Sequence, residues 1–197
     1  MRFNTYKNLE FIISNISSQI VSFFLLIFMA PLYLLIYFLI YFIDGRPIFY
    51  NSFRVGYMGK CFKLYKFRTM SENNLEEKFR ITKLGKFLRR SSLDELPQLF
   101  NIIKGDMVFV GPRPLPEDIL FDSKLRRFAK KRSSVKPGLT GLSQALSKGL
   151  PRAFSQKLIY DFLYIKKKSI LFDLIIILLT LKDLKKRFVF NKSGTTL

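Results

Sequence analysis

The chain has 197 residues, which suffices for one domain with a substantial core but hardly for two. Lysine and arginine number 34 against 14 aspartates and glutamates, so the formal net charge is +20. The absence of histidine excludes an imidazole base and a histidine-ligated metal, and a single cysteine excludes an intrachain disulfide and a cysteine-based zinc site.

The first element in the chain is a long uncharged run from Phe11 to Ile43, flanked by Glu10 and Asp44. As a helix rising about 1.5 Å per residue it would be roughly 50 Å long, well beyond the ~30 Å hydrocarbon core of a bilayer. The run is too long for a signal peptide and no small-residue cleavage site follows it, so we expect it to stay on the mature protein. The sequence therefore predicts a membrane segment over residues 1–43 and a second domain over residues 44–197.

Pro31 lies in the middle of this run and removes one backbone donor, which kinks or breaks a helix. Two arms result, Phe11–Ala30 and Leu32–Ile43, and the second arm, at roughly 18 Å, is too short to cross a bilayer alone. A kinked spanning helix would leave the amino terminus outside, whereas a re-entrant hairpin would keep both ends on one face of the membrane. Both geometries place the basic remainder in the cytoplasm, because all lysines and arginines except Arg2 and Lys7 follow the run.

Beyond Asp44 the pattern predicts an α/β domain that is mostly helical, with a few short strands. Strands are indicated by apolar–basic alternation and short apolar runs, helices by apolar spacing of three and four, and loops by polar, proline and glycine residues. Strands are expected at 47–50, 60–70 and 107–110, helices at 83–90, 96–103, 118–131 and 154–168, and loops at 71–78 and 135–142.

The last apolar stretch, Leu171–Leu181, is interrupted by Asp173 and is too short to span a bilayer. We expect it to form a helix that lies in the membrane interface. Residues 182–187 then supply cations that would meet anionic head groups, at about 1 kcal/mol for each lysine or arginine.

Asp94 and Glu95 form an adjacent acidic pair in a strongly basic chain, and without histidine such carboxylates are candidates for acid–base or nucleophilic chemistry. A structural explanation is a capping box formed by Ser92 and Glu95, but Pro97 would then fall at the fifth helical position, where proline is unfavourable. If Asp94 is the cap instead, Pro97 lies third, and Asp94 lies at a helix amino terminus that favours anions. A capping and a reactive Asp94 both remain open at this point.

Basic residues recur where strands end. Pro112 and Pro114 restrict the backbone around Arg113 and hold its guanidinium in a defined direction, which suits a bidentate phosphate contact, although a rigid turn with a solvated arginine is an equal alternative. Lys66 and Arg68 form another basic group, which alone is typical of a solvated strand edge. The sequence has no Walker loop and no Rossmann fingerprint, so a phosphate would be held by side chains and metal.

Four ordered motifs, Lys66–Met70, Ser92–Gln98, Gly111–Pro114 and Lys136–Gly141, resemble those of the bacterial sugar transferases called monotopic phosphoglycosyl transferases. The likeness extends from Lys7 to about Lys185, and four motifs in order are far more specific than any one. The length matches the minimal catalytic unit of that family.

The resemblance implies transfer of a phosphosugar from a UDP-sugar to polyprenyl phosphate, with release of UMP, a Mg²⁺ cofactor and a covalent aspartyl-phosphosugar intermediate. It implies that Asp94 is the nucleophile and a metal ligand, and that Glu95 is its partner. The basic positions around the site would be Lys66, Arg68, Arg89 and Arg113, and the structural prolines Pro31, Pro112 and Pro114.

The membrane segment of that family is a re-entrant helix broken at a Ser-Pro pair. Here Ala30 precedes Pro31, so the proline is kept and the serine hydroxyl is lost. The resemblance therefore favours the re-entrant geometry, with the protein on the cytoplasmic face of the bacterial inner membrane. Anionic lipids and downstream glycosyltransferases are the further partners that we expect, and nucleic acid is not.

This chain departs from the family pattern at several positions. Leu142–Ala145 replaces the usual tryptophan after the Thr-Gly step, Phe154 stands where a tryptophan is common, and Glu10 replaces an aspartate. These positions, with the altered loop over 142–154, concern sugar recognition rather than reaction class. The alternative function is a non-catalytic, membrane-anchored basic protein that binds anionic lipid or nucleic acid, which explains the charge and the anchor but not the ordered motifs.

Overall fold

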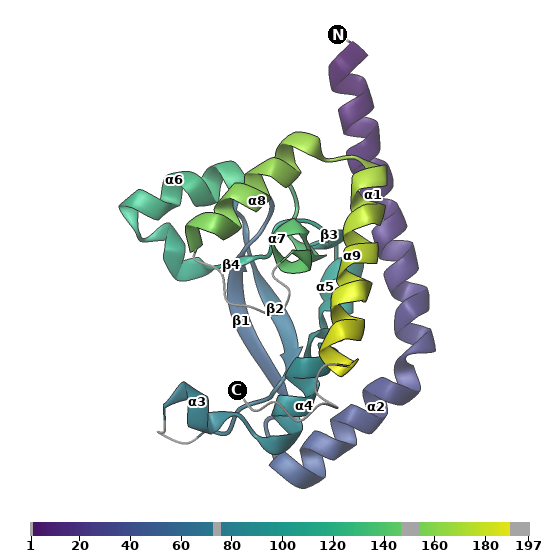
Figure 1. Ribbon diagram of the computed structural model, residues 1–197, viewed down its shortest axis with the longest axis vertical. Coiled ribbons are helices and arrows are strands. Elements are labelled where there is room, and N and C mark those ends of the chain that lie inside the picture. The colour runs from purple at the N-terminus through teal and green to yellow at the C-terminus, as the bar shows by residue number, and fades with distance from the viewer. Residues whose placement is uncertain (1, 73–75, 147–153, 190–197) are drawn as a thin grey trace.

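A computed structural model describes residues 2–72, 76–146 and 154–189 of the chain (Figure 1). The fold is α/β and mostly helical, with one long apolar helix at the amino terminus and two small sheets. The predicted fold class is confirmed to this extent.

The uncharged run and the residues before it form two helices, α1 (Arg2–Phe28) and α2 (Ala30–Leu39), and end in a π-helical turn at Ile40–Asp44. Met29 lies between the helices, and Pro31 lies in the first turn of α2, where a missing backbone donor costs little. In Figure 1, α2 leaves the direction of α1 at an angle. The re-entrant topology that we expect of this bend remains a prediction.

Both helices present apolar side chains outward. Among the described residues, Phe11–Phe28 is the helix that is long and apolar enough to cross a membrane, and Ala30–Asp44 is apolar but shorter. Exposed side chains include Phe24, Phe28 and Phe42, the last of which is 77% exposed. Such a surface is unusual for a soluble protein and indicates membrane association.

The main sheet is a long hairpin extended by one short strand. Strands β1 (Phe49–Val55) and β2 (Cys61–Phe67) pair in antiparallel fashion through a 3-10 turn, and β4 (Leu115–Pro116) pairs with the other edge of β1. The extended segment expected at 47–50 therefore begins as a strand two residues later and continues to Val55, and the strand within 60–70 is confirmed.

A second sheet pairs β3 (Val108–Val110) with β5 (Gly138–Thr140) in parallel. The prediction of a loop over 135–142 is wrong at these three residues. The glycines that indicated a loop instead permit close backbone approach, because a Cβ at Gly138 would lie 2.1 Å from the backbone nitrogen of Gly111.

The helices follow the predicted order with shifted ends. They are α3 (Glu77–Arg80), α4 (Lys83–Ser91), α5 (Gln98–Ile103), α6 (Ser123–Arg132), α7 (Leu142–Ala145), α8 (Phe154–Lys167) and α9 (Ile170–Val189), with 3-10 turns at Leu93–Glu95 and Glu117–Leu120. The helix expected over 118–131 is thus split, and α9 continues past the expected interfacial stretch. Helices α3 and α7 were not predicted, and α3 begins within the loop expected over 71–78. Residues 147–153 of the altered loop lie outside the described residues.

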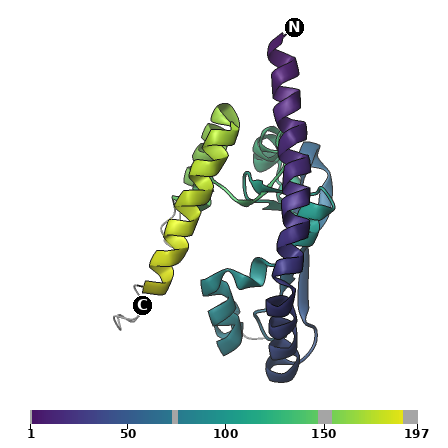
Figure 2. The ribbon, with the colours of Figure 1, turned by 90° about the vertical axis from the view of Figure 1, so that its right-hand side faces the viewer.

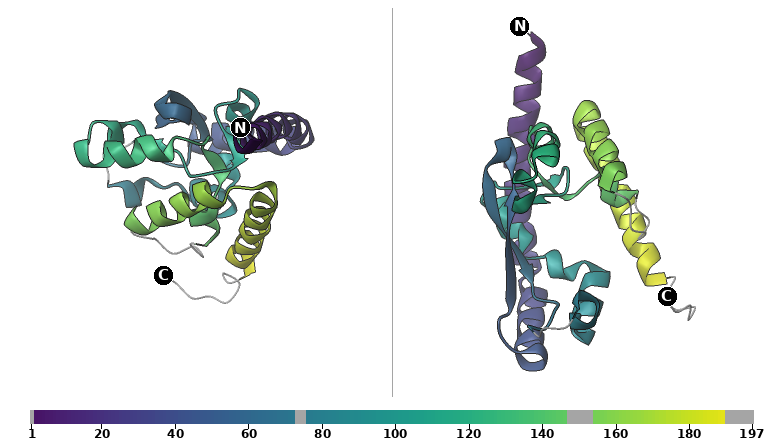
Figure 3. Two further views of the ribbon diagram at one scale, coloured as in Figure 1. Left: turned by 90° about the horizontal axis from the view of Figure 1, so that it is seen from above. Right: turned by 90° about the vertical axis from the view of Figure 1, so that its left-hand side faces the viewer.

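Three apolar clusters tie these elements together. Ile36 and Ile40 of the membrane segment are buried with Phe67 and Leu88. The membrane segment and the domain after it therefore share one apolar core across the expected boundary at residue 43. The second cluster surrounds α5, which packs against α1, and the third joins β3, α7, α8 and α9. Figure 2 shows α9 apart from α1 and inclined to it, and Figure 3 shows α8 and α9 on the side of the molecule away from the β1–β2 hairpin.

Candidate active site

The acidic pair lies in a sharp turn between two helices. Helix α4 ends at Ser91, Ser92 adopts a left-handed conformation with φ 58°, and a 3-10 turn then carries Asp94 and Glu95. No side-chain cap bond forms at Ser92, and the residue at the amino-terminal cap of α5 is Pro97. Neither capping explanation therefore holds, and the buried Asp94 lacks the structural role that the sequence left open.

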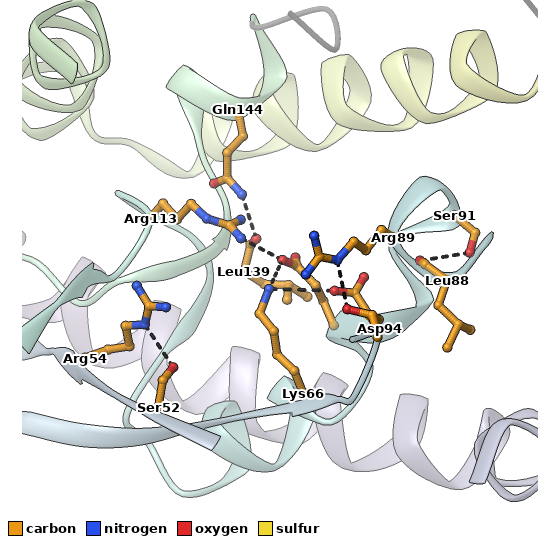
Figure 4. Close-up of polar contacts among 12 residues, drawn as sticks. Ser52, Arg54, Lys66, Leu88, Arg89, Ser91, Asp94, Arg113, Leu139 and Gln144 are labelled. Atoms are coloured by element: carbon orange, nitrogen blue, oxygen red, sulfur yellow. Dashed lines mark hydrogen bonds and ion pairs between the residues drawn. The ribbon is translucent and has the colours of Figure 1, made fainter. Parts of the chain in front are cut away.

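Two cations converge on Glu95. They are Lys66 and Arg113, and both are labelled in Figure 4. Lys66, near the end of β2, places its Nζ 2.6 Å from Oε1 of Glu95, and Arg113, from the loop after β3, places Nη2 2.8 Å from the same oxygen. Lys66 Nζ also lies 3.9 Å from Oδ2 of Asp94. The Asp94 side chain is 10% exposed, whereas that of Arg113 is 48% exposed and remains open to solvent and ligands.

The two adjacent carboxylates have opposite pKa shifts. Burial raises the pKa of Asp94 to about 6, with repulsion from Glu95 adding to the effect and attraction to Lys66 opposing it. Burial alone would also raise the pKa of Glu95, but its contacts with Arg113 and Lys66 outweigh burial and lower that pKa to about 2. Such divergence within a pair of acids is typical of catalytic sites.

Arg89 is a third cation of this cluster. It lies in the last turn of α4, donates from Nε to Oγ1 of Thr69 at 2.8 Å, and lowers the pKa of Asp94 through its charge. Figure 4 shows its guanidinium beside Asp94. Three of the four predicted basic residues, Lys66, Arg89 and Arg113, are thus brought together around the acidic pair.

The fourth predicted cation, Arg68, lies elsewhere. Its side chain is buried, and Nη2 donates to the backbone carbonyls of Asp44 and Gly45 at 2.5 and 2.7 Å. These carbonyls lie at the end of the π-helical turn that ends the membrane segment, away from the acidic pair. Both bonds use Nη2, and the buried Nε has no hydrogen-bond partner among the described residues, so the expected substrate-binding role of Arg68 stays a prediction.

A buried ion pair that was not predicted from the sequence supports the Pro-Arg-Pro loop, residues Pro112–Pro114. Arg132 of α6 donates from Nε to Oδ2 of Asp161 at 2.7 Å, with side-chain exposures of 7% and 2%, and it also donates to the backbone carbonyl of Arg113. On the other side of the loop, Gly138 N donates to the carbonyl of Pro112 at 3.0 Å. The sequence feature that could have revealed this pair is Asp161, which is the one acidic residue of helix α8.

A cavity of about 710 Å³ adjoins Arg113. Charged and polar side chains line much of it, among them Arg54, Asp118, Gln144, Lys157 and Asp161. Phe154 lines it as well, so three of the positions that depart from the family pattern, Ser143, Gln144 and Phe154, line this space. The volume is within the range of small-molecule sites in proteins.

The residues fit the magnesium ion that the resemblance implies. Among the described residues no group of three or more acidic or cysteine side chains could enclose a metal. Mg²⁺ does not need such a cage, because it is commonly bound by one or two carboxylates together with substrate phosphates. Asp94 is the carboxylate suited to this, since Oε1 of Glu95 is already held by two cations.

Carboxylates of divergent pKa, clustered cations and an adjoining cavity on a membrane-associated α/β fold define a candidate site for phosphate transfer chemistry. The model of the family described as bacterial sugar transferase matches residues 9–187, and the chain belongs to this family. Membership confirms the predicted resemblance and argues against the non-catalytic alternative.

The chain is similar to several named relatives. It is 38% identical over 187 residues to the exopolysaccharide production protein ExoY of Sinorhizobium fredii, covering 82% of this chain and 80% of the relative. It is 40% identical over 158 residues to the galactosyl transferase CpsE of Streptococcus agalactiae, covering 71% of this chain and 35% of the relative. It is 35% identical over 188 residues to the UDP-glucose:undecaprenyl-phosphate glucose-1-phosphate transferase of Klebsiella pneumoniae, covering 88% of this chain and 40% of the relative. The chain spans less than half of the last two relatives.

Proposed function

We propose that the protein transfers a sugar 1-phosphate from a UDP-sugar to a polyprenyl phosphate such as undecaprenyl phosphate, releasing UMP. The observation that carries the proposal is the acidic pair with opposite pKa shifts among Lys66, Arg89 and Arg113, in a chain of this family. The product would be a membrane-bound diphosphosugar that downstream glycosyltransferases extend into a bacterial glycan.

Asp94 is the nucleophile in this proposal. Its carboxylate attacks the phosphorus attached to the sugar, and the bond from that phosphorus to the bridging oxygen breaks, so that UMP leaves. An oxygen of the polyprenyl phosphate then attacks the same phosphorus and releases Asp94. Burial supports this role, because a poorly solvated carboxylate with a pKa of about 6 is ionised at neutral pH yet held in few stabilising contacts.

Glu95 and the cations prepare the site for an anionic substrate. Glu95 stays ionised and fixes Lys66 and Arg113 beside the nucleophile, where both can stabilise charge on the transferring phosphoryl group. Arg113 suits two phosphate oxygens because its guanidinium is half exposed and its backbone is restrained. When bound to Asp94 and the diphosphate, Mg²⁺ would neutralise part of the diphosphate charge.

The cavity beside Arg113 is the proposed place for the nucleoside and the sugar of the donor. It opens next to the guanidinium that would hold the diphosphate, and it presents both hydrogen-bonding and apolar side chains. The names of the relatives include both a galactosyl and a glucose-1-phosphate transferase, so they do not define one sugar. We expect Gln144 and Phe154 to contribute to the choice.

The membrane segment re-enters the cytoplasmic leaflet in this proposal, with the bend near Met29 and Pro31 turning the chain back. The length of the uncharged run, the short second arm and the exposed apolar faces of α1 and α2 support this topology. The cations near the end of α9, Lys182 and Lys185, would then contact anionic head groups of the bacterial inner membrane.

Cysteine labelling tests the topology. A single cysteine at position 4, Asn4→Cys in a Cys61→Ser background, should resist an impermeant maleimide in intact spheroplasts and react once the membrane is opened. Labelling from the outside would contradict the re-entrant geometry and favour a spanning helix. Pro31→Leu should straighten the helix, expose position 4 to the outside and lower activity.

Release of UMP tests the function. The purified protein in detergent, with Mg²⁺ and polyprenyl phosphate, is incubated with a panel of UDP-sugars. We expect UMP and a polyprenyl diphosphosugar in equal amounts from at least one donor. Failure of the full panel to release UMP, with the protein folded by circular dichroism, would remove the proposed activity.

A further inference from the structure

Arg68 joins the end of the membrane segment to the strand that carries Lys66. It follows β2 directly, and its backbone nitrogen donates to the carbonyl of Ile48 at 2.9 Å. Its guanidinium reaches back to the carbonyls of Asp44 and Gly45. The last carbonyls of a helical segment lack intrahelical partners and carry partial negative charge, so a buried guanidinium is a well-matched partner for them.

Asp44 makes a second connection, to the helix that carries Arg89. Its Oδ2 accepts a hydrogen bond from Oγ1 of Thr82 at 2.8 Å, and the same Oγ1 accepts one from Gly85 N, which caps α4. Helix α4 lies directly on the backbone after β2, because a Cβ at Gly85 would be 2.1 Å from the carbonyl oxygen of Thr69. The side chain of Thr69 in turn bonds Arg89.

Apolar packing reinforces these two connections. Ile36 of α2 and Ile40 are buried against Phe67, the last residue of β2, and Leu88 of α4, with Leu93 packed against the same cluster. Leu93 immediately precedes Asp94. A rotation of α2 would therefore displace the three elements that carry Lys66, Arg89 and Asp94.

We infer that Arg68 and Asp44 are positioning residues that hold the acidic pair at a fixed place relative to the membrane segment, and so serve reaction with the lipid-borne phosphate rather than with the soluble donor. This inference rests on the proposed function. A UDP-sugar is dissolved in water and can bind the site even when the site is displaced from the membrane, whereas a polyprenyl phosphate is confined to the membrane surface. Displacement by about 1 Å can cost on the order of a hundredfold in rate.

Separate rate constants for the two substrates test the inference. With one nucleophile serving donor and acceptor in turn, kcat/KM for each substrate reports its own half of the reaction. For Arg68→Gln and Asp44→Ala in lipid nanodiscs, we expect kcat/KM for undecaprenyl phosphate to fall about tenfold or more, and kcat/KM for the UDP-sugar to change less than about twofold. With a short-chain, water-soluble polyprenyl phosphate, the variants should approach the unmodified protein.

Two control variants separate positioning from folding. Asp44→Asn keeps an oxygen that accepts from Thr82 and should behave as the unmodified protein does. Arg80→Gln removes a comparable bond, from Arg80 Nε to the carbonyl of Ser71 at 3.0 Å, away from the membrane segment, and should leave both rate constants unchanged. An equal fall in both rate constants for Arg68→Gln would overturn the inference, since that is what a folding defect or a direct donor contact produces.

A distance measurement is independent of catalysis. Spin labels at two exposed positions, Leu35→Cys on α2 and Lys86→Cys on α4 in a Cys61→Ser background, should give one narrow distance distribution in nanodiscs. Arg68→Gln and Asp44→Ala should broaden it, and Asp44→Asn should not. An unchanged distance distribution in Arg68→Gln and Asp44→Ala would overturn the inference. This outcome is independent of the proposed function, which would be removed instead by the failure of every UDP-sugar to release UMP.

Discussion

The Asp94–Glu95 turn and the Arg132–Asp161 pair both bring acids and bases together, and Arg113 connects them. Its side chain reaches Glu95, and its backbone carbonyl accepts from Arg132. The first cluster has three cations for two acids and is partly exposed, whereas the second is a buried one-to-one pair at the wall of the cavity beside Arg113. In the second, burial raises the pKa of Asp161 and lowers that of Arg132.

The difference separates a cluster with spare positive charge, which suits an anionic ligand, from a buried pair whose two charges cancel and which supports the neighbouring backbone. The excess of cations around Asp94 leaves charge for an incoming diphosphate to neutralise. The buried pair has no such excess, and its effect on chemistry passes through the backbone of Arg113. We therefore expect variants of the first cluster to lose rate and variants of the second to lose stability.

The largest expected effect is on rate, for Asp94→Asn. An amide keeps the size of the side chain but is not a competent nucleophile, so turnover should fall by at least about a thousandfold while the fold is retained. Release of UMP from the UDP-sugar measures the loss, and circular dichroism serves as the control. Near-normal turnover would exclude Asp94 as the nucleophile.

The next effect is on stability, for Asp161→Ala. Removing this acid leaves Arg132 buried without its partner and should lower the free energy of unfolding by about 3–5 kcal/mol. Asp94→Ala should not lower the free energy of unfolding. The pKa of this buried carboxylate is raised to about 6, so keeping it ionised at neutral pH costs on the order of 3 kcal/mol, and the alanine removes that cost. Thermal unfolding in detergent compares the two variants.

A double variant sharpens this contrast. Arg132→Met combined with Asp161→Ala removes both buried charges and should recover most of the stability. It should not recover activity, because the carbonyl of Arg113 then loses its hydrogen bond from Arg132. Full recovery of activity would show that the pair has no part in positioning the loop.

A smaller loss of rate is expected for Arg113→Lys. Lysine keeps the charge but lacks the planar fork that contacts two phosphate oxygens, so kcat/KM for the donor should fall by roughly ten- to a hundredfold. Stability should change little, because the side chain is half exposed. Unchanged kinetics would indicate a merely solvated arginine.

The smallest effect is a gradual dependence on pH. The pKa of Asp94 is raised to about 6, so protonation removes the nucleophile as the pH falls below neutrality. The rate of the donor half-reaction should be constant above about pH 7 and roughly tenfold lower at pH 5. Glu95, with a pKa of about 2, should add no further step in that range. A rate that stays constant down to pH 5 would be inconsistent with this assignment.

Features that depend on local sequence were predicted well. The strand within 60–70, helix α4 and helix α8 follow from alternation and spacing, and the family resemblance implied the acidic pair with Lys66, Arg89 and Arg113. These residues come together because a hairpin strand, a helix end and a rigid turn each present one part of the site.

Features that depend on distant partners were not predicted. Gly138–Thr140 is a strand only because β3, some thirty residues earlier, pairs with it. Arg132 and Asp161 meet through packing of α6 against α8, and the partners of Arg68 are carbonyls at the end of the membrane segment. Local sequence does not identify the partners in these contacts, because each side chain alone is typical of a solvated helix face or strand edge.

Detection of a phosphosugar on Asp94 tests the central claim most directly. The protein is incubated with its UDP-sugar without acceptor, quenched in acid and digested with trypsin, which should release residues 91–104 as one peptide. We expect this peptide to gain the mass of the sugar phosphate, with fragmentation placing it on Asp94 and not on Glu95. The added mass should disappear when polyprenyl phosphate is supplied. A protein that turns over the donor and acceptor without ever carrying this mass would contradict the account.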